Sequence, residues 1–242
     1  MHLRYKLEKM ATQYKMELDT KPPRIPYRET ITKNAEGHCR HKKQSGGAGQ
    51  FGEVYLRIEP LERGSGFEFV DHVKGGVIPG VFMPAVEKGV RQALADGVIA
   101  GYPVEDLRVI IYDGKTHPVD GKEVAFVTAG RKATIAAIQA ASPIILEPIV
   151  NVEVLVPDAN MGDIAGDLSS RRGHVTGTTP RGHVVAIAGE VPLAEITDYA
   201  SKLKSVTGGQ GSYSMEFSRY AAVPPPTQQK LAASFKLHEE DE

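Results

Sequence analysis

The first residues of the chain carry apolar side chains at helical spacing. They are Leu3, Leu7, Met10, Tyr14 and Leu18, with charged residues between them. This spacing of three and four predicts one amphipathic helix, which the prolines at 22 and 23 are expected to end. Residues 25–31 read as a short extended segment. One helix and one strand cannot bury a core alone. Either the chain begins inside a domain whose first half is absent, which is the interpretation we favour, or this helix docks on something else.

Residues 30–145 alternate between strand and helix patterns and are predicted to form one unit. We expect strands at 30–42, 53–60, 67–71 and 104–112, and helices at 84–94 and 121–141. Residues 113–118 read as a turn before the second helix. Asp120 stands three residues before Glu123, which is the spacing of a capping box, so Asp120 is predicted to cap that helix.

Residues 146–222 are predicted to form a second unit. The expected order is strand 149–156, helix 158–171, strands 174–179 and 182–191, helix 193–206 and strand 211–220. This β-α-β-β-α-β order is typical of a ferredoxin-like domain. Gly173 and Gly208 are predicted to end the two helices, and residues 180–182 to form a hairpin turn. Beyond this unit, we expect a short helix at 227–236 and a disordered acidic tail.

The composition limits the classes of function. The 242 residues suffice for two domains, and a hydrophobic content of 41% can fill their cores. A formal net charge of -1 gives no global attraction to nucleic acid, so any RNA contact has to come from local patches. The single cysteine, Cys39, excludes an internal disulfide and fits a reducing cytoplasm. The sequence contains no run of about 18 apolar residues, which is the length that a membrane-spanning helix would need.

One local patch joins a cationic run to a glycine-rich loop. Arg40, His41, Lys42 and Lys43 precede glycines at positions 46, 47, 49 and 52. Glycine lets the backbone turn and approach another surface closely, and residues 53–58 alternate like a returning strand. The pattern predicts a hairpin tip. That tip either enters a phosphate-rich site or carries a charged flank that is only solvated.

Other chemistry finds little support in the residue pattern. A Walker loop needs Gly-x-x-x-x-Gly-Lys-Ser/Thr followed by a helix, whereas Gly47 and Gly52 are followed by Glu53 and a strand. No two histidines have metal-binding spacing on a helix, and Asp163 and Asp167 read as a solvated face. The sequence therefore predicts no catalytic residue, no cofactor-binding residue and no metal ligand.

Cations gather near the helix ends of the second unit. Arg171 and Arg172 follow its first helix, and Lys202 and Lys204 lie near the end of its second. Such charges complement the helix dipole. Together with Arg181 they could equally clamp RNA phosphates, and the sequence leaves both interpretations open.

Nine short motifs run through the chain. They are SGGAGQFG at 45–52, GGVIP at 75–79, PAVEKG at 84–89, AGYP at 100–103, LEP at 146–148, MGD at 161–163, SRRG at 170–173, VPLAE at 191–195 and GSYSMEF at 211–217. In this order they resemble translation elongation factor G. Nearly the whole chain is covered, and so many motifs in register make the resemblance highly specific.

The resemblance implies an α+β fold class and a set of domain boundaries. Residues 1–29 would be the end of domain III, and residues 30–145 would be domain IV, with the fold of ribosomal protein S5 domain 2. Residues 146–222 would be the ferredoxin-like domain V, followed by a C-terminal helix and tail at 223–242. The GTPase domain is expected to be missing. GTP and magnesium would then bind outside this chain, which is not itself expected to be an enzyme.

The resemblance also implies that the protein is a monomer, that it acts in the cytoplasm on ribosomes, and that it does not bind membranes. In the family, the domain IV tip enters the decoding centre of the small ribosomal subunit and follows the messenger–tRNA duplex during translocation. Domain V contacts large-subunit rRNA. The expected RNA-contacting residues of the tip are Lys42, Lys43, Ser45, Gly46, Gly47, Gly49, Gln50, Lys115 and His117. Those of domain V are Arg171, Arg172, Arg181 and Lys204.

Two departures from the family pattern lie in the tip loops. Ala48 stands where members usually carry a basic residue, and Gly121-Lys122 where they usually have two serines. Because of these changes, the protein could instead be a paralogue that resembles elongation factor G and acts in ribosome recycling or ribosome protection. A third hypothesis is a small-molecule kinase on the S5-like fold. It requires a glycine loop that leads into a helix, whereas this loop leads into a strand.

Overall fold

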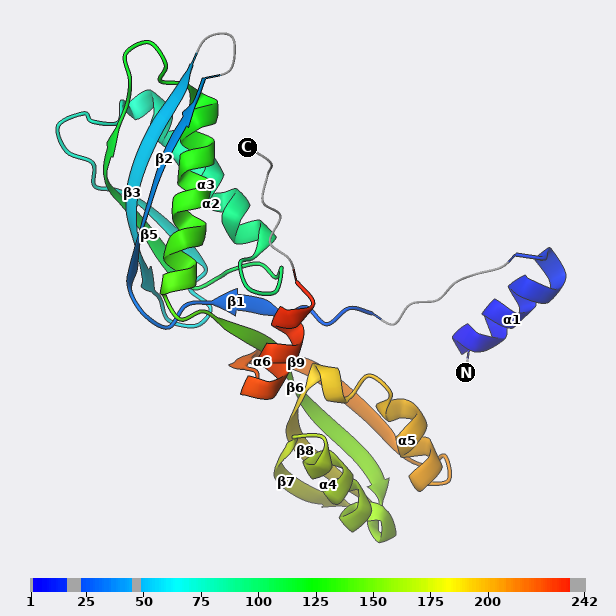
Figure 1. The fold of residues 1–242 in the computed structure, drawn as a ribbon. Helices are drawn as coiled ribbons and strands as arrows, with labels where there is room; N and C mark the ends of the chain where they lie inside the picture. The colour runs from blue at the N-terminus through cyan, green and yellow to red at the C-terminus, as the bar shows by residue number, and fades with distance from the viewer. Residues whose placement is uncertain (1, 17–22, 45–48, 236–242) are drawn as a thin grey trace.

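The computed structural model describes residues 2–16, 23–44 and 49–235, which form an N-terminal helix and two α+β units (Figure 1). The helix, α1, spans His2–Tyr14, and its Tyr5 and Tyr14 side chains are exposed. Leu18 and Pro22, which the sequence assigned to this helix and its end, lie outside the described residues, as does the acidic tail. Among the residues described, no helix is both long and apolar enough to cross a bilayer.

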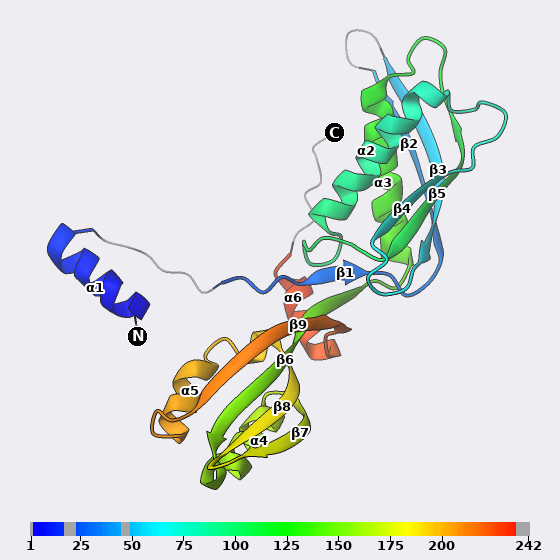
Figure 2. The same cartoon turned by 180° about the vertical axis from the view of Figure 1, so that it is seen from behind.

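The first unit is a four-stranded sheet with two helices on one face (Figures 1 and 2). The strands lie in the order β2 (Ala35–Lys43), β3 (Gln50–Pro60), β5 (Leu107–Lys115) and β4 (Phe67–Asp71). Only β4 and β5 are parallel. A short 3₁₀ turn, η1 (Gly80–Phe82), leads into α2 (Met83–Asp96), and α3 (Glu123–Ala140) follows β5. The predicted helices of this unit and its strands at 53–60, 67–71 and 104–112 are present, with some ends shifted.

Small residues let α3 lie close to the sheet and to α2. Its alanines at 125, 129, 133 and 137 are completely buried. A Cβ atom on Gly37 of β2 would lie 2.0 Å from the Ala133 carbonyl oxygen, and one on Gly89 of α2 would lie 2.1 Å from that of Val127. Since real Cβ atoms do not come so close, glycine is required at both contacts.

The second unit has the predicted β-α-β-β-α-β order. Its strands are β6 (Ile144–Pro157), β7 (His174–Arg181), β8 (Val184–Pro192) and β9 (Ser212–Ala222). Its helices are α4 (Met161–Ser170) and α5 (Tyr199–Val206), preceded by the 3₁₀ turns η2 (Asp158–Asn160) and η3 (Leu193–Glu195). The antiparallel order β9-β6-β8-β7 is that of a ferredoxin-like sheet. Valines of β6 pack against Ile164, Leu168, Tyr199 and Leu203 of the helices.

Strand β6 connects the two units directly. It begins four residues after α3 ends and runs on into the second sheet. The short strand β1 (Arg28–Thr30) pairs with its first residues, and helix α6 (Pro225–Ala233) follows β9. The predicted strand at 30–42 is therefore wrong as a single element. The N–H groups of Thr32 and Lys33 bond to the Ala141 carbonyl and separate β1 from β2.

Several predicted ends of elements also moved. Strand β5 continues to Lys115 instead of turning at Asp113. Glycine at position 114 allows this, because a Cβ atom there would lie only 2.4 Å from the Glu53 carbonyl oxygen. The turn between β7 and β8 is Gly182-His183, not 180–182. The segment predicted as a helix from 158 begins with a 3₁₀ turn that leads into α4, and in the segment predicted from 193 a 3₁₀ turn is separated from α5 by residues 196–198. Helix α6 starts at Pro225, which needs no N–H in the first turn.

The helix caps were predicted with mixed success. Gly208 has a positive φ of 58° and ends α5 as expected, with the Gly209 N–H bonded to the Lys204 carbonyl. At the end of α4, however, the left-handed residue is Arg172, with φ 58°, and not Gly173. Asp120 does not cap α3: the N-cap position is Lys122, with no side-chain cap.

Replacing Gly89 with alanine should destabilise the protein by about 1–3 kcal/mol, because the new methyl group overpacks the α2–α3 contact. Gly166 is a matched control, since it also lies inside a helix but has open space where its Cβ would be. Gly166→Ala should instead stabilise by about 0.5–1 kcal/mol. Urea unfolding of both variants gives the comparison, and equal effects at the two positions would contradict the close helix packing.

Candidate functional site

The strands β2 and β3 of the hairpin reach the same end of the first unit as the loop that connects β5 to α3 (Figure 1). The hairpin ladder extends to the pair Lys43 and Gln50. The second loop connects β5 to α3. The Phe51 N–H donates a hydrogen bond of 2.7 Å to the Asp120 carbonyl, and Phe51 also forms a parallel bridge with Gly121. The start of β3 and the second loop are therefore held together by their backbones.

Two glycines allow close contacts here, Gly49 between the hairpin and the second loop and Gly121 within the second loop. A Cβ atom on Gly49 would lie 2.7 Å from the Asp120 carboxyl group, and one on Gly121 would lie 2.5 Å from Thr116 Oγ1. Gly121 does not have a positive φ, so the requirement there is one of space. The Asp120 side chain, predicted as a helix cap, instead lies against Gly49 and is 3.4 Å from His117 Nδ1.

The loops enclose a cleft of about 200 Å³. Its lining residues are Arg40, Lys42, Lys43, Gln44, Gly49, Gln50, Phe51, His117 and Asp120. Four of these residues carry or can carry positive charge, against one carboxylate. Phe51 is only 7% exposed, with the Arg40 guanidinium 5.3 Å from its ring centre and the His117 ring at 6.3 Å. Phe51 therefore forms a packed floor and offers no free face for stacking.

His117 is oriented by the backbone that follows it. Its Nδ1 atom accepts hydrogen bonds from the N–H groups of Asp120, at 3.2 Å, and Val119, at 3.4 Å. A nitrogen that accepts has no proton of its own, so the neutral ring carries its proton on Nε2. The side chain is half exposed, and since Nε2 has no hydrogen-bond partner among the described residues, its N–H group could donate to a ligand.

The structure brings together five of the nine predicted tip residues. Lys42, Lys43, Gly49, Gln50 and His117 all line the cleft. Lys115 is exposed at the end of β5, in register with Glu53, and does not line it. The predicted residues Ser45, Gly46 and Gly47 lie outside the described residues.

Sequence reasoning missed four lining residues: Arg40, Gln44, Phe51 and Asp120. Arg40 is the first residue of the predicted cationic run and Gln44 directly follows its last, so proximity alone could have included both among the site residues. Phe51 and Asp120 could not be found in this way, because their contact joins segments that are far apart in the sequence.

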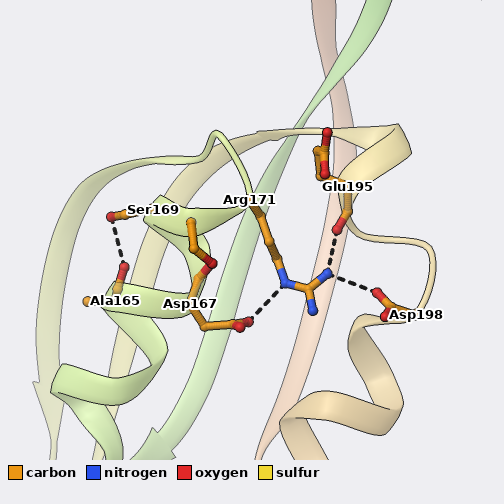
Figure 3. Close-up of polar contacts among 7 residues, drawn as sticks. Ala165, Asp167, Ser169, Arg171, Glu195 and Asp198 are labelled. Atoms are coloured by element: carbon orange, nitrogen blue, oxygen red, sulfur yellow. Dashed lines mark hydrogen bonds and ion pairs between the residues drawn. The ribbon is translucent and has the colours of Figure 1, made fainter. Parts of the chain in front are cut away.

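In the second unit, Arg171 is bound by acidic groups of its own chain (Figure 3). Its Nε donates to Asp167 at 2.9 Å, and its Nη1 donates to Asp198 at 2.8 Å and to the Glu195 carbonyl. The hydrogen bond from Arg171 lowers the pKa of the Asp198 carboxyl. The guanidinium also lies 5.3 Å from the ring centre of Tyr199, whose pKa is raised to about 12 by burial.

Arg172 is held more tightly still. Its Nη1 and Nη2 donate to both oxygens of Glu147, at 2.7 and 2.9 Å, and its Nε lies 3.0 Å from Glu195. The Glu147 side chain is 3% exposed. The hydrogen bond to Glu147 raises the pKa of Arg172. This forked pair fastens the end of α4 to β6.

The other two predicted cations of this unit are more accessible. Arg181 pairs with Glu153 at 3.2 Å, and both side chains are about half exposed. Lys204 is exposed in the last turn of α5, and no ion pair to its side chain is found in the described part of the chain. RNA contact at all four cations stays a prediction. For Arg171 and Arg172, the internal carboxylates supply a structural role that would compete with it.

The described residues hold no group of three or more His, Cys, Asp or Glu side chains arranged to bind a metal ion. The predicted solvated face of Asp163 and Asp167 holds for Asp163, which is exposed in the first turn of α4, and is wrong for Asp167, whose largely buried side chain pairs with Arg171.

Comparison with known proteins decides the family. Residues 23–142 match the family model for elongation factor G, domain IV, and residues 144–231 match that for the elongation factor G C-terminus. The chain belongs to the elongation factor G family. Its first unit is thus domain IV, carrying the tip cleft, and its second unit is the C-terminal domain.

Individual relatives agree with this assignment to the elongation factor G family. An elongation factor G-like protein of Thermotoga maritima is 49% identical, and an elongation factor G of Aquifex pyrophilus is 45% identical, each over 96% of this chain. A crystal structure from Thermus thermophilus superposes with a TM-score of 0.85 at 41% identity, also over 96% of the chain. The chain spans about a third of each of these proteins: 34%, 33% and 34%.

Replacing Arg172 with alanine should destabilise the protein by about 2–4 kcal/mol, because the buried Glu147 carboxylate loses its partner. Arg181→Ala, which breaks an exposed pair, should cost no more than about 1 kcal/mol. Thermal and urea unfolding of the two variants separate a structural arginine from a surface one. Equal, small effects would show that the Arg172 pair does not stabilise the domain.

Proposed function

We propose that this chain is the ribosome-contacting part of an elongation factor G-type translocase. In this proposal, the domain IV tip enters the decoding centre beside the messenger–tRNA duplex, and the C-terminal domain contacts large-subunit rRNA. The observation that carries the proposal is the cationic cleft that two loops form at one end of domain IV. Membership of the elongation factor G family supports it.

The position of the cleft suits a probing role. The loops lie at the N-terminal end of α3, whereas β6 and the C-terminal domain follow its C-terminal end. At 18 residues, α3 separates the two ends by about 27 Å. Close packing of α3 on the sheet through Gly37 makes this distance a rigid one. A tip held in this way can be placed at a fixed distance from the point where the C-terminal domain is anchored.

The contact we propose is with phosphates and sugars. Lys42 and Lys43 are exposed and supply charge for phosphate oxygens. The Nε2–H group of His117 can donate to a phosphate or a 2′-hydroxyl group. Because Phe51 is covered by Arg40 and His117, we expect no base stacking on its ring. Such a site holds RNA of any sequence.

In this account the chain supplies position and no chemistry of its own. GTP and magnesium would be bound by a region of the whole factor outside this chain, which would make that factor a ribosome-dependent GTPase. We expect it to act as a monomer in the cytoplasm, where its ribosomal partner is found.

The alternative function is that of a paralogue acting in ribosome recycling or protection. Gly121 favours it, because a serine Cβ at this position would lie 2.5 Å from Thr116 Oγ1 and 2.8 Å from the His117 carbonyl oxygen. The second tip loop is therefore packed more tightly than a serine would allow. The name of the Thermotoga relative, an elongation factor G-like protein, points the same way. A translocation assay of the whole factor, set against a subunit-splitting assay with recycling factor, separates the two.

Binding of this chain to ribosomes should weaken steeply as salt rises. Lys42→Gln combined with Lys43→Gln should lower the affinity and reduce the slope of log K against log salt by about 2, since each phosphate contact contributes about 1. Fluorescence anisotropy of the labelled chain with ribosomes, from low to high salt, measures both quantities.

Lys33→Gln combined with Lys88→Gln is the matched control. Both lysines are exposed in domain IV outside the cleft, so this variant has the same net charge as the tip variant. It should retain the original slope. Binding that does not change with salt, or equal losses in the two double variants, would refute phosphate contact at the tip.

A further inference from the structure

The side chain of Glu29 in β1 is completely buried. Its Oε2 accepts hydrogen bonds from the N–H groups of Val98, at 2.7 Å, and Ile99, at 3.0 Å. Its Oε1 accepts from Ala100, at 2.8 Å, and Tyr102, at 3.1 Å. Taking a carboxylate out of water is costly unless its oxygens are bonded. Here four backbone donors take the place of water, and no ion pair to Glu29 occurs among the described residues.

The loop that supplies these donors is shaped around the carboxylate. It follows α2 and turns at Gly97 and Gly101, whose φ values of 74° and 77° are in the left-handed region. A Cβ on Gly97 would lie 2.4 Å from the Tyr102 carbonyl oxygen. Without Glu29 the four N–H groups would have no acceptor in this arrangement, so the loop depends on the side chain as much as the side chain depends on the loop.

The backbone of Glu29 links the same loop to the strand that joins the two domains. Its N–H donates to the Pro103 carbonyl at 2.8 Å, and its carbonyl accepts from the Glu105 N–H at 2.9 Å. On its other side, β1 pairs with the start of β6, where Glu29 is opposite Ile145. One short strand therefore connects a loop of domain IV to the beginning of the C-terminal sheet.

The far side of β6 completes this layer. The Ile145 carbonyl accepts from the Val223 N–H at 3.0 Å, and the Ile145 N–H donates to Gln228 Oε1 of α6 at 3.2 Å. The segment after α6 returns to domain IV, since a Cβ on Gly101 would lie 2.7 Å from the Phe235 ring. Residues 103–105, β1, the start of β6 and the end of β9 thus form one hydrogen-bonded layer across the junction (Figure 1).

We propose that Glu29 is a positioning residue that fixes the orientation of the tip-bearing domain relative to the C-terminal domain. The loop at 98–102 belongs to domain IV, and the carboxylate that holds it stands on a strand paired with β6. A change of interdomain angle at this junction would have to break these bonds. The orientation is a property of the chain itself, and only its use in moving RNA rests on the proposed function.

Glu29→Gln tests the proposed positioning role, because it removes the carboxylate with almost no change in the shape of the side chain. The amide NH₂ group replaces one oxygen and faces two N–H donors, so half of the acceptor capacity is lost. Spin labels on Val119→Cys in the tip loop and His183→Cys in the β7–β8 turn, in a Cys39→Ser background, report the interdomain distance by pulsed electron spin resonance. Both label positions are exposed. We expect a narrow distance distribution in the chain that keeps Glu29 and a broad one in the E29Q chain.

Glu105→Gln is the control, because Glu105 lies in the same layer but its side chain makes only a partly exposed pair with Arg28. It should leave the distribution narrow. Circular dichroism and amide exchange in β3 and β8 establish that both domains stay folded. A folded E29Q chain with an unchanged distribution would overturn the proposal. If the E29Q chain does not fold, Gln228→Ala is used in its place, because it removes the hydrogen bond between Gln228 and the Ile145 N–H on the other side of β6. This variant must broaden the distribution of interdomain distances, or the proposal fails. No ribosome is used, so failed ribosome binding cannot be mistaken for failure here.

Discussion

The arrangement of this molecule depends on one buried carboxylate. Glu29 gives up its hydration completely and recovers hydrogen bonds only from the loop that follows α2. The same residue has its backbone in a layer shared with β6. Because a buried charge without its donors is strongly unfavourable, the loop, the short strand and the connecting strand have to form together, and this couples the two domains.

What the coupled domains hold in place is the tip. Glycines and alanines let α3 pack closely on the sheet, and this rigid packing fixes the opposite end of domain IV relative to the junction. There the Asp120 carbonyl joins the loop after β5 to the start of β3, and bare backbone at Gly49 lets the two segments approach. The cationic cleft follows from these contacts. Arg171 and Arg172 serve the C-terminal domain in a comparable way, as internal ties to Asp167, Asp198 and Glu147.

The sequence predicted what depends on local pattern. Alternation and helical spacing located the elements of both domains, and Gly208 ended α5 as its conformational freedom suggested. Contacts between distant segments were beyond such reasoning. Asp120 has the spacing of a cap, but its side chain lies against Gly49 of the hairpin. Arg172, not Gly173, takes the left-handed position, and its guanidinium binds the distant Glu147. Glu29 gave no signal at all, since four backbone donors 69 to 73 residues away leave no trace in composition or spacing.

Hydrogen exchange of the amides of Val98, Ile99, Ala100 and Tyr102 in the unmodified chain tests the Glu29 junction most directly. These amides lie outside any helix or strand, so local structure alone would leave them unprotected. Our account predicts that they exchange as slowly as the paired amides of β6, because opening them requires the junction layer to open. Exchange as fast as that of the exposed turn at Gly75 and Gly76 would contradict the account.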